Sequence, residues 1–286
     1  MLLRIAGITI SISSTDPAAT AYVDGAAGAR FLAEDDGAPD LELTLERVTA
    51  MPPRRGDLVF DSGAVWSMFD DGGGGLRVDC RSPSFGEAPY KVALFDRDFA
   101  AGRVLLRDDV FRDGTLGALE YPLDELIVSH LLARGRGVEL HSSGVIARDG
   151  RGRLFVGQSG AGKSTTARLW MESEEVEIVS DDRVVVREID GGWRMFGTPW
   201  HGEAMLSSPA SAPLHHIYLL QHAPRTRVAD VAPAEAAARL FACTFPLFHD
   251  AGALAFTLDC IDKLVRAVPV HVLEFTPDAS VVEAAR

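Results

Sequence analysis

Residues 157 to 164 combine residue types at a spacing suited to binding a phosphate chain. They read Gly-Gln-Ser-Gly-Ala-Gly-Lys-Ser, which fits the pattern G-x-x-x-x-G-K-[ST] at every fixed position. Glycines let backbone N–H groups wrap around phosphate oxygens, the lysine reaches the β and γ oxygens, and the last hydroxyl can hold Mg²⁺. We therefore predict that this segment binds a nucleoside triphosphate together with Mg²⁺.

The flanking sequence supplies the context that this motif requires. An apolar run at 154–156 predicts a strand that leads into the loop, and 163–173 predicts a helix whose N-terminus adds partial positive charge beneath the phosphates. A chance glycine-rich turn is the weaker interpretation, because one of only three lysines in the chain stands at the motif position. The residues expected to contact the nucleotide are Gly157, Gln158, Ser159, Gly160, Ala161, Gly162, Lys163, Ser164 and Thr165.

Two adjacent carboxylates, Asp181 and Asp182, follow the next predicted strand at 176–179. The helix rises roughly 16 Å at ~1.5 Å per residue, and a strand of about five residues returns a similar length at ~3.3 Å each. The pair should therefore come back beside the loop, at the carboxyl edge of a parallel sheet, where ligands bind. One carboxylate would join Ser164 in holding Mg²⁺ and the other would act as base for an attacking hydroxyl, in either order.

The alternative is an ordinary Asp-Asp turn at a strand end. Neighbouring carboxylates beside a polyphosphate repel each other and need an offsetting charge. Arg183 is the nearest candidate in the sequence.

Three segments together resemble the catalytic domain of HPr kinase/phosphorylase and its kinase-like relatives. They are Leu140-His141-Ser142-Ser143-Gly144-Val145, the octapeptide at 157–164, and Ser-Asp-Asp-Arg-Val-Val-Val at 180–186. The resemblance spans roughly 122 to 286. It implies a fold related to phosphoenolpyruvate carboxykinase, ATP and Mg²⁺, and phosphate transfer to a serine hydroxyl. The catalytic residues that it implies are His141, Lys163, Asp181 and Asp182.

The segment 197–203, Gly-Thr-Pro-Trp-His-Gly-Glu, looks like a stretch of the same kinase-like relatives. His201 and Glu203, with Arg183, are therefore candidates for an acceptor pocket. A turn that packs Trp200 under the sheet explains the segment as well, and His141 could instead be an ordinary core histidine.

Composition limits the class of protein. The chain has 286 residues, is 47% hydrophobic and carries a net charge of −13, which excludes general disorder and argues against nucleic acid as a partner. We expect no membrane segment, since no apolar run is long enough. The three cysteines, Cys80, Cys243 and Cys260, have no metal-ligand spacing and fit buried thiols in the cytoplasm. The sequence is compatible with either a monomer or a homo-oligomer.

The chain is expected to form two domains of an α/β protein. Residues 1–120 alternate in the manner of a β-rich domain, and 121–286 predict the phosphate-loop catalytic domain. The first of these does not resemble the α/β N-terminal domain of the HPr kinases, which argues against protein HPr as the substrate. The main elements expected in the second domain are helices at 122–134, 163–173, 233–244 and 251–267, and strands at 138–140, 144–147, 154–156, 176–179, 183–188, 193–196 and 270–275.

The leading hypothesis is an ATP-dependent, HPr-kinase-like serine kinase that phosphorylates a hydroxyl of a protein, a peptide or a small molecule. A regulatory nucleotide-binding or peptide-recognition module and a nucleotide hydrolase are the alternatives. A phosphoenolpyruvate carboxykinase ranks lower, because it needs a further lysine on its metal. Lys91 and Lys263 lie in segments unsuited to that role.

Overall fold

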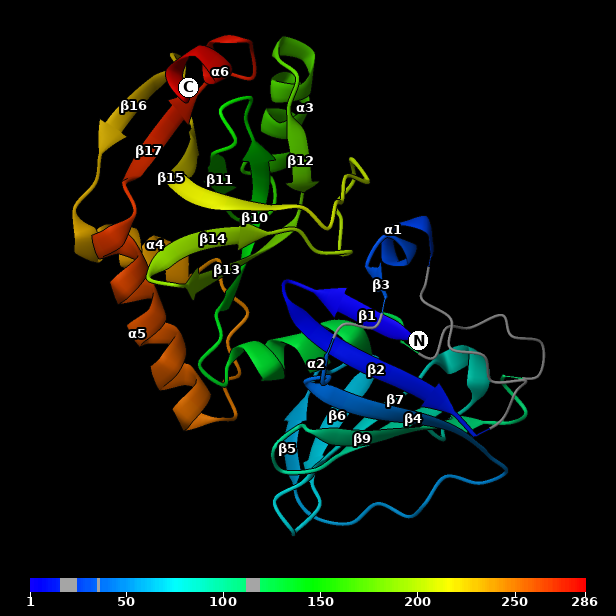
Figure 1. Cartoon of the computed structure of the whole chain (residues 1–286). Coiled ribbons are helices and arrows are strands. Elements are labelled where there is room, and N and C mark those ends of the chain that lie inside the picture. The colour runs from blue at the N-terminus through cyan, green and yellow to red at the C-terminus, as the bar shows by residue number, and fades with distance from the viewer. Residues whose placement is uncertain (16–24, 35–36, 112–118) are drawn as a thin grey trace. The chain divides into compact units, whose positions relative to one another are not determined.

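The computed structural model describes residues 1–15, 25–34, 37–111 and 119–286. The chain is an α/β protein with two large mixed sheets (Figure 1). It divides into two compact units, Met1–Leu131 and Leu132–Arg286, whereas the sequence placed the division at 120/121. Each unit is described by itself.

The first unit is built around a nine-stranded sheet in the order β3-β1-β2-β4-β9-β8-β7-β6-β5. The pairs β2–β4 and β4–β9 are parallel and the other pairs are antiparallel. The elements are β1 (Leu2–Ile5), β2 (Ile8–Ser14), α1 (Gly25–Ala29), β3 (Leu32–Ala33), β4 (Leu41–Val48), β5 (Leu58–Asp61), β6 (Trp66–Asp70), β7 (Leu76–Cys80), η1 (Pro83–Phe85), β8 (Lys91–Phe95), β9 (Ala101–Arg107) and α2 (Leu123–Leu132).

The second unit contains an eight-stranded sheet in the order β11-β10-β13-β14-β15-β17-β16, with β12 paired to β10 and β11 also paired to β15. Helices α3 and α6 pack on one face and α4 and α5 on the other. The elements are β10 (Val138–Ile146), β11 (Gly152–Val156), α3 (Lys163–Ser173), β12 (Glu177–Ser180), β13 (Arg183–Ile189), β14 (Gly192–Phe196), β15 (Ser211–His222), β16 (Arg227–Asp230), α4 (Pro233–Phe241), α5 (Ala251–Ala267), β17 (Val270–Phe275) and α6 (Ser280–Ala284).

Strand β15 explains why both faces of this sheet are covered. Ile217 and Leu219 belong to the apolar cluster under α4 and α5, whereas Tyr218 and Leu220 belong to the cluster under α3 and α6. Successive side chains of a strand point to opposite faces, so an uninterrupted apolar run buries both. The sequence analysis did not predict this strand.

Two expectations about the second unit are wrong in detail. The sheet is mixed rather than parallel: β10 pairs antiparallel with β11, β12 and β13, while β11–β15 and β15–β17 are parallel. The segments 138–140 and 144–147 are one continuous strand, β10, because small and polar residues between the apolar runs are accommodated inside the sheet.

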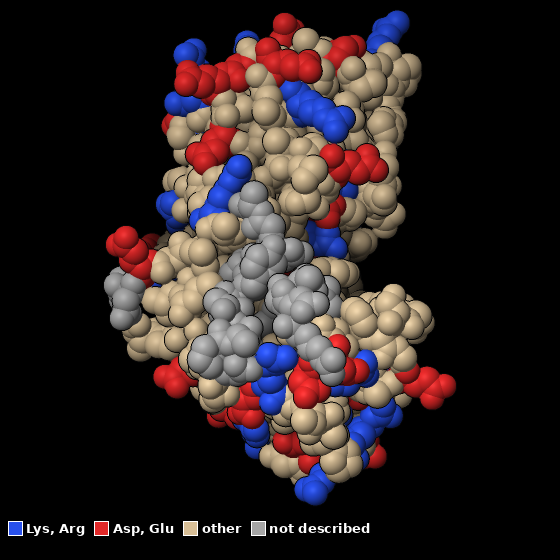
Figure 2. All heavy atoms as spheres, turned by 90° about the vertical axis from the view of Figure 1, so that its right-hand side faces the viewer, with Lys and Arg blue, Asp and Glu red and all other residues tan. Residues whose placement is uncertain are grey.

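The surface and the cysteines add three facts. Acidic and basic side chains of the described residues are interspersed on the face drawn in Figure 2. Cys80, Cys243 and Cys260 are buried and form no disulfide. Within the described ranges, no helix combines the length and the apolar character needed to cross a bilayer.

A stacked group of rings on β15 and β17 predicts acid sensitivity. His216 stacks on Tyr218 and His271, and its Nδ1 lies 2.8 Å from Nδ1 of His215. Burial, and then electrostatic repulsion from His215, His271 and Arg153, lowers the pKa of His216 from its ordinary 6.5 to about 4. The unfolded chain therefore binds one more proton than the folded chain between these values, so stability is present above pH 6.5 and falls as the pH drops towards 4.

We expect His216→Gln to reduce the loss of stability on acidification. The measurement is the urea midpoint of each protein at pH 7.5 and at pH 5.0. An equal drop in wild type and variant would show that His216 does not contribute to the acid sensitivity.

Candidate functional site

The pairing of β10 explains how the glycine-rich loop at 157–164 and the aspartate pair come together. Strands β11 and β12 both run antiparallel to β10, one on each side, with Val156 opposite Ser142 and Ser180 opposite Gly144. They therefore end at the same edge of the sheet. Because the loop follows β11 directly and Asp181 follows β12 directly, both lie at this edge (Figure 1).

The loop itself is held in a tight shape by left-handed glycines and by its lysine. Gly160 and Gly162 have φ values of 79° and 100°, which favour glycine. A Cβ on Gly162 would also lie 2.5 Å from the Phe275 ring. Lys163 is buried, and its Nζ donates to the carbonyls of Gly157 (3.1 Å) and Gln158 (3.3 Å). Backbone N–H groups of such a loop, at the start of α3, form the kind of concavity that binds anions.

Burial lowers the pKa of the Lys163 ammonium, while the charge of Asp182 and more weakly that of Asp181 act to raise it. A dianionic ligand beside this ammonium would favour its charged form in the same way.

Asp181 is fully buried and accepts hydrogen bonds from four donors. The Ser164 hydroxyl donates to Oδ2 at 3.0 Å, as does the backbone N–H of Ala204. The N–H groups of Gly202 (2.9 Å) and Leu206 (3.2 Å) donate to Oδ1. The carboxylate is thus fully occupied, and its role in this structure is to fix the Ser164 side chain and the 202–206 segment.

The 197–206 segment wraps closely around this carboxylate. A Cβ on Gly202 would lie 2.8 Å from Asp181 Oδ2, so glycine is required for this approach. Trp200 is buried, and its carbonyl accepts from the hydroxyl of Ser180 at 3.1 Å. The segment therefore buries Trp200 and also supplies backbone donors to the Asp181 carboxylate.

Asp182 has different partners from Asp181. Its Oδ1 lies 2.9 Å from Nε2 of His141, and its Oδ2 forms an ion pair with the Arg183 guanidinium. Burial acts to raise the pKa of Asp182, but the hydrogen bond from His141 and the charge of Arg183 outweigh it, so the pKa lies below its ordinary value. The carboxylate is therefore ionised at neutral pH and is partly accessible.

Ser180 forms the turn that separates the two aspartates. Its hydroxyl accepts from the backbone N–H groups of Asp182 (3.2 Å) and Arg183 (3.1 Å). Such a side-chain turn lets the chain leave β12 and enter β13 within three residues. Consequently Asp181 and Asp182 point to different neighbours.

The other predicted site residues occupy varied positions. Gln158 and Ser159 are exposed in the loop, and Thr165 is half-buried in the first turn of α3. His201 Nδ1 lies 3.1 Å from the carbonyl of Gly202, and Glu203 is exposed on the segment around Asp181. No hydrogen bond or ion pair described here joins His201 or Glu203 side chains to either aspartate.

Several residues at the site were missed by the sequence analysis. His222 Nε2 lies 3.0 Å from the Gly160 carbonyl, and its ring packs on Phe275. Glu139 and Phe245 both contact Arg183. Glu139 and His141 alternate on one strand, a spacing that places both on one face and that could have drawn attention to Glu139. The other two come from distant segments and carry no local signal.

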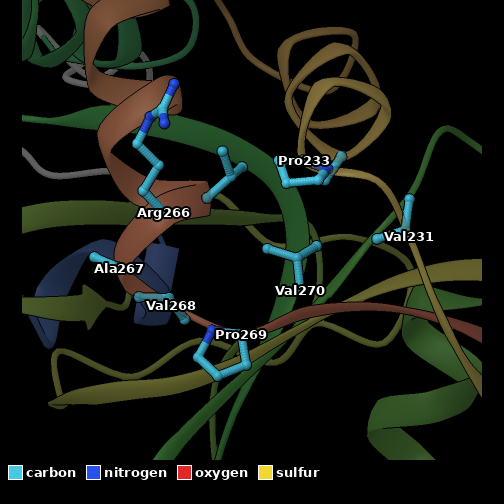
Figure 3. A pocket seen from close by; sticks show the side chains of 9 residues that line it. Val231, Pro233, Arg266, Ala267, Val268, Pro269 and Val270 are labelled. Carbon is cyan, nitrogen blue, oxygen red and sulfur yellow. The ribbon is translucent and has the colours of Figure 1, made fainter.

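A surface pocket of about 230 Å³ lies elsewhere in the unit, between α4, α5 and the start of β17 (Figure 3). Its lining is mainly aliphatic and proline side chains, such as Pro233, Val268 and Pro269. The Arg266 guanidinium is paired with Asp262 at 2.9 and 3.0 Å. The glycine-rich loop at 157–164 lies against the opposite end of β17, at Phe275, so this pocket is separate from the candidate site.

Comparison with known proteins gives no independent assignment: no family model matches the chain, and no curated protein matches it.

Proposed function

We propose that the protein is an ATP-dependent kinase of the HPr-kinase-like type, with the second unit as its catalytic domain and the phosphate loop as its nucleotide site. The proposal rests on the observation that two adjacent aspartates have different partners. Asp181 holds the loop serine at 3.0 Å, and Asp182 meets His141 at the same sheet edge. A chance glycine-rich turn does not require either contact.

The residues fit a Mg²⁺ ion bound mainly by phosphate oxygens. The Ser164 hydroxyl donates a hydrogen bond to Asp181, which leaves its oxygen lone pairs available to a cation. The described residues contain no group of three His, Cys, Asp or Glu side chains able to hold a metal alone. When bound, Mg²⁺ would neutralise charge on the β- and γ-phosphates. Of the two orders left open by the sequence, this favours Asp181 as partner of the metal site and Asp182 as base.

In the proposed reaction the acceptor hydroxyl oxygen forms a bond to the γ-phosphorus as the bond to the β-γ bridging oxygen breaks. Asp182 takes the hydroxyl proton, and His141 orients the carboxylate. Lys163 and the loop N–H groups stabilise the charge on the transferred group and on the ADP that leaves. His201 and Glu203 are retained as candidate acceptor contacts, because they lie on the segment that Asp181 anchors.

We also propose a cytoplasmic location and no nucleic-acid partner, for the following reasons. The three buried free thiols fit a reducing cytoplasm. The net charge of −13 favours a nucleotide and a small or peptide acceptor over nucleic acid. A carboxykinase stays the weakest alternative, because Lys91 is buried in an ion pair with Glu120 in the first unit and Lys263 pairs with Asp259 on the outside of α5.

Measurement of ADP release from ATP and Mg²⁺ separates these functions. The acceptors to compare are none, free serine, a serine-containing peptide mixture and oxaloacetate. We expect ADP release that depends on a hydroxyl acceptor, with phosphate recovered on that acceptor. Release of ADP and inorganic phosphate without an acceptor would indicate a hydrolase, and binding without turnover a regulatory module. Dependence on oxaloacetate would indicate a carboxykinase. Each of these three results contradicts the kinase.

A further inference from the structure

Three side chains of alternating charge form a continuous row from the interior to the candidate site. The Glu139 side chain is almost completely buried, and its Oε1 lies 3.4 Å from Nε of Arg183. Arg183 in turn pairs with Asp182 through Nη1. The guanidinium also lies over the Phe245 ring, 4.5 Å from its centroid.

The register of the sheet creates this row. His141 on β10 stands directly opposite Arg183 on β13, and Glu139 stands opposite Val185. Glu139 and His141 are two residues apart on one strand and share a face, so Arg183 has His141 beside it and Glu139 on the diagonal. Asp182, one residue before Arg183, is reached by both His141 and Arg183.

A carboxylate that must receive a proton has to be held in one orientation. The torsion that turns a carboxylate plane is broad and weakly restrained by the backbone. His141 alone contacts only Oδ1, and a single contact leaves the plane free to turn about that oxygen. The second contact, from Arg183 to Oδ2, fixes the plane.

Arg183 can do this only if its own long side chain is fixed. The Glu139 carboxylate attracts Nε from 3.4 Å, an ion-pair distance rather than a hydrogen bond, and Phe245 supports the planar face of the guanidinium. Burying a carboxylate at Glu139 is costly unless it is paired. Its position beneath Arg183, rather than at the surface, is consistent with a positioning role.

We propose that Glu139 is a positioning residue that orients Asp182 through Arg183, and that Phe245 is the second support of the same guanidinium. This inference rests on the proposed kinase function. It adds two residues outside the recognisable motifs to the set on which turnover depends. It also assigns Arg183 to orienting the base, rather than to the direct acceptor contact expected from the sequence.

The test is a double-mutant cycle on turnover with ATP, Mg²⁺ and the acceptor identified by the ADP assay. We expect Arg183→Met to lower kcat by about 10²-fold and Glu139→Gln by about 10-fold, within the loss that small misplacements of reacting groups cause. The dissociation constant for ATP should stay unchanged. In the Arg183→Met background, Glu139→Gln should have no further effect, because it acts through the missing guanidinium.

Arg187→Met is the matched control. Arg187 lies on the same strand, four residues beyond Arg183, stacks over Phe196 at 5.9 Å and donates to the Arg136 carbonyl at 2.9 Å. It should retain wild-type kcat. If Glu139→Gln does not fold, Phe245→Leu replaces it in the cycle, since Phe245 is only half-buried.

Additive effects of the 139 and 183 substitutions, or wild-type kcat in Glu139→Gln or Phe245→Leu, would overturn the inference while leaving the kinase function intact. A wild-type protein without acceptor-dependent turnover would instead contradict the proposed function, and this inference would fall with it.

Discussion

Lys163→Ala is expected to abolish measurable phosphate transfer. The substitution removes the only lysine of the loop, and a single donor aimed at developing charge is worth about 10²–10³ in kcat. It also removes the two internal hydrogen bonds from Nζ to the carbonyls of Gly157 and Gln158. Both effects lower ATP affinity and turnover together. The measurements are ADP release and calorimetric binding of ATP with Mg²⁺.

The chain offers a matched lysine for this experiment. Lys263 is exposed on α5 and pairs with Asp259 at 2.8 Å. Lys263→Ala should bind ATP and turn it over at the wild-type rate, since exposed pairs of this kind contribute little. Retention of transfer in Lys163→Ala would mean that the loop is not the nucleotide site.

Asp182→Asn is expected to lower kcat by about 10²–10⁴-fold, the usual contribution of a positioned general base. The asparagine keeps the size and one oxygen of the carboxylate but cannot take the hydroxyl proton. Because Asp182 is partly accessible and contacts His141 and Arg183 rather than the loop, ATP affinity and folding should be little changed. Paired measurements of kcat and of the ATP dissociation constant check this separation.

Asp181→Asn should behave differently. The amide nitrogen of the asparagine would face backbone N–H donors from the 202–206 segment and could not accept from them. Each buried donor left without an acceptor lowers the free energy of unfolding by about 1–3 kcal/mol. We therefore expect a lower melting temperature and weaker binding of ATP with Mg²⁺ as well as lower turnover. Equal behaviour of the two variants, or normal activity in Asp182→Asn, would contradict the roles assigned to the two aspartates.

Local patterns were sufficient to predict much of the architecture. The helices at 163–173 and 251–267 and the strand at 270–275 have the expected bounds, because periodicity and turn residues act over short distances. Strand β15 was missed, since its apolar run buries both faces and so lacks the alternation of a half-exposed strand. In the first unit, β2 pairs antiparallel with β1, and Ala6 and Gly7, which join the two strands, both have positive φ.

The candidate site likewise has one part that local sequence patterns predict and one part that they do not. The octapeptide and the aspartate pair are contiguous in sequence and could be recognised, and their meeting followed from element lengths. Element lengths alone place the two segments at one edge only in a parallel sheet. Their meeting instead depends on β10 pairing antiparallel with both β11 and β12. The different roles of Asp181 and Asp182 depend on the 202–206 segment, Glu139 and Phe245. These are long-range contacts that no local pattern encodes.

The most direct test of the central claim is a crystal structure with a non-hydrolysable ATP analogue and Mg²⁺. We predict the triphosphate in the loop at residues 157–164, with Lys163 Nζ turned from the loop carbonyls to the phosphates, Mg²⁺ on Ser164, and the Asp182 carboxylate facing the γ-phosphate. A nucleotide bound elsewhere, or an Asp182 carboxylate directed away from the γ-phosphate, would contradict the account.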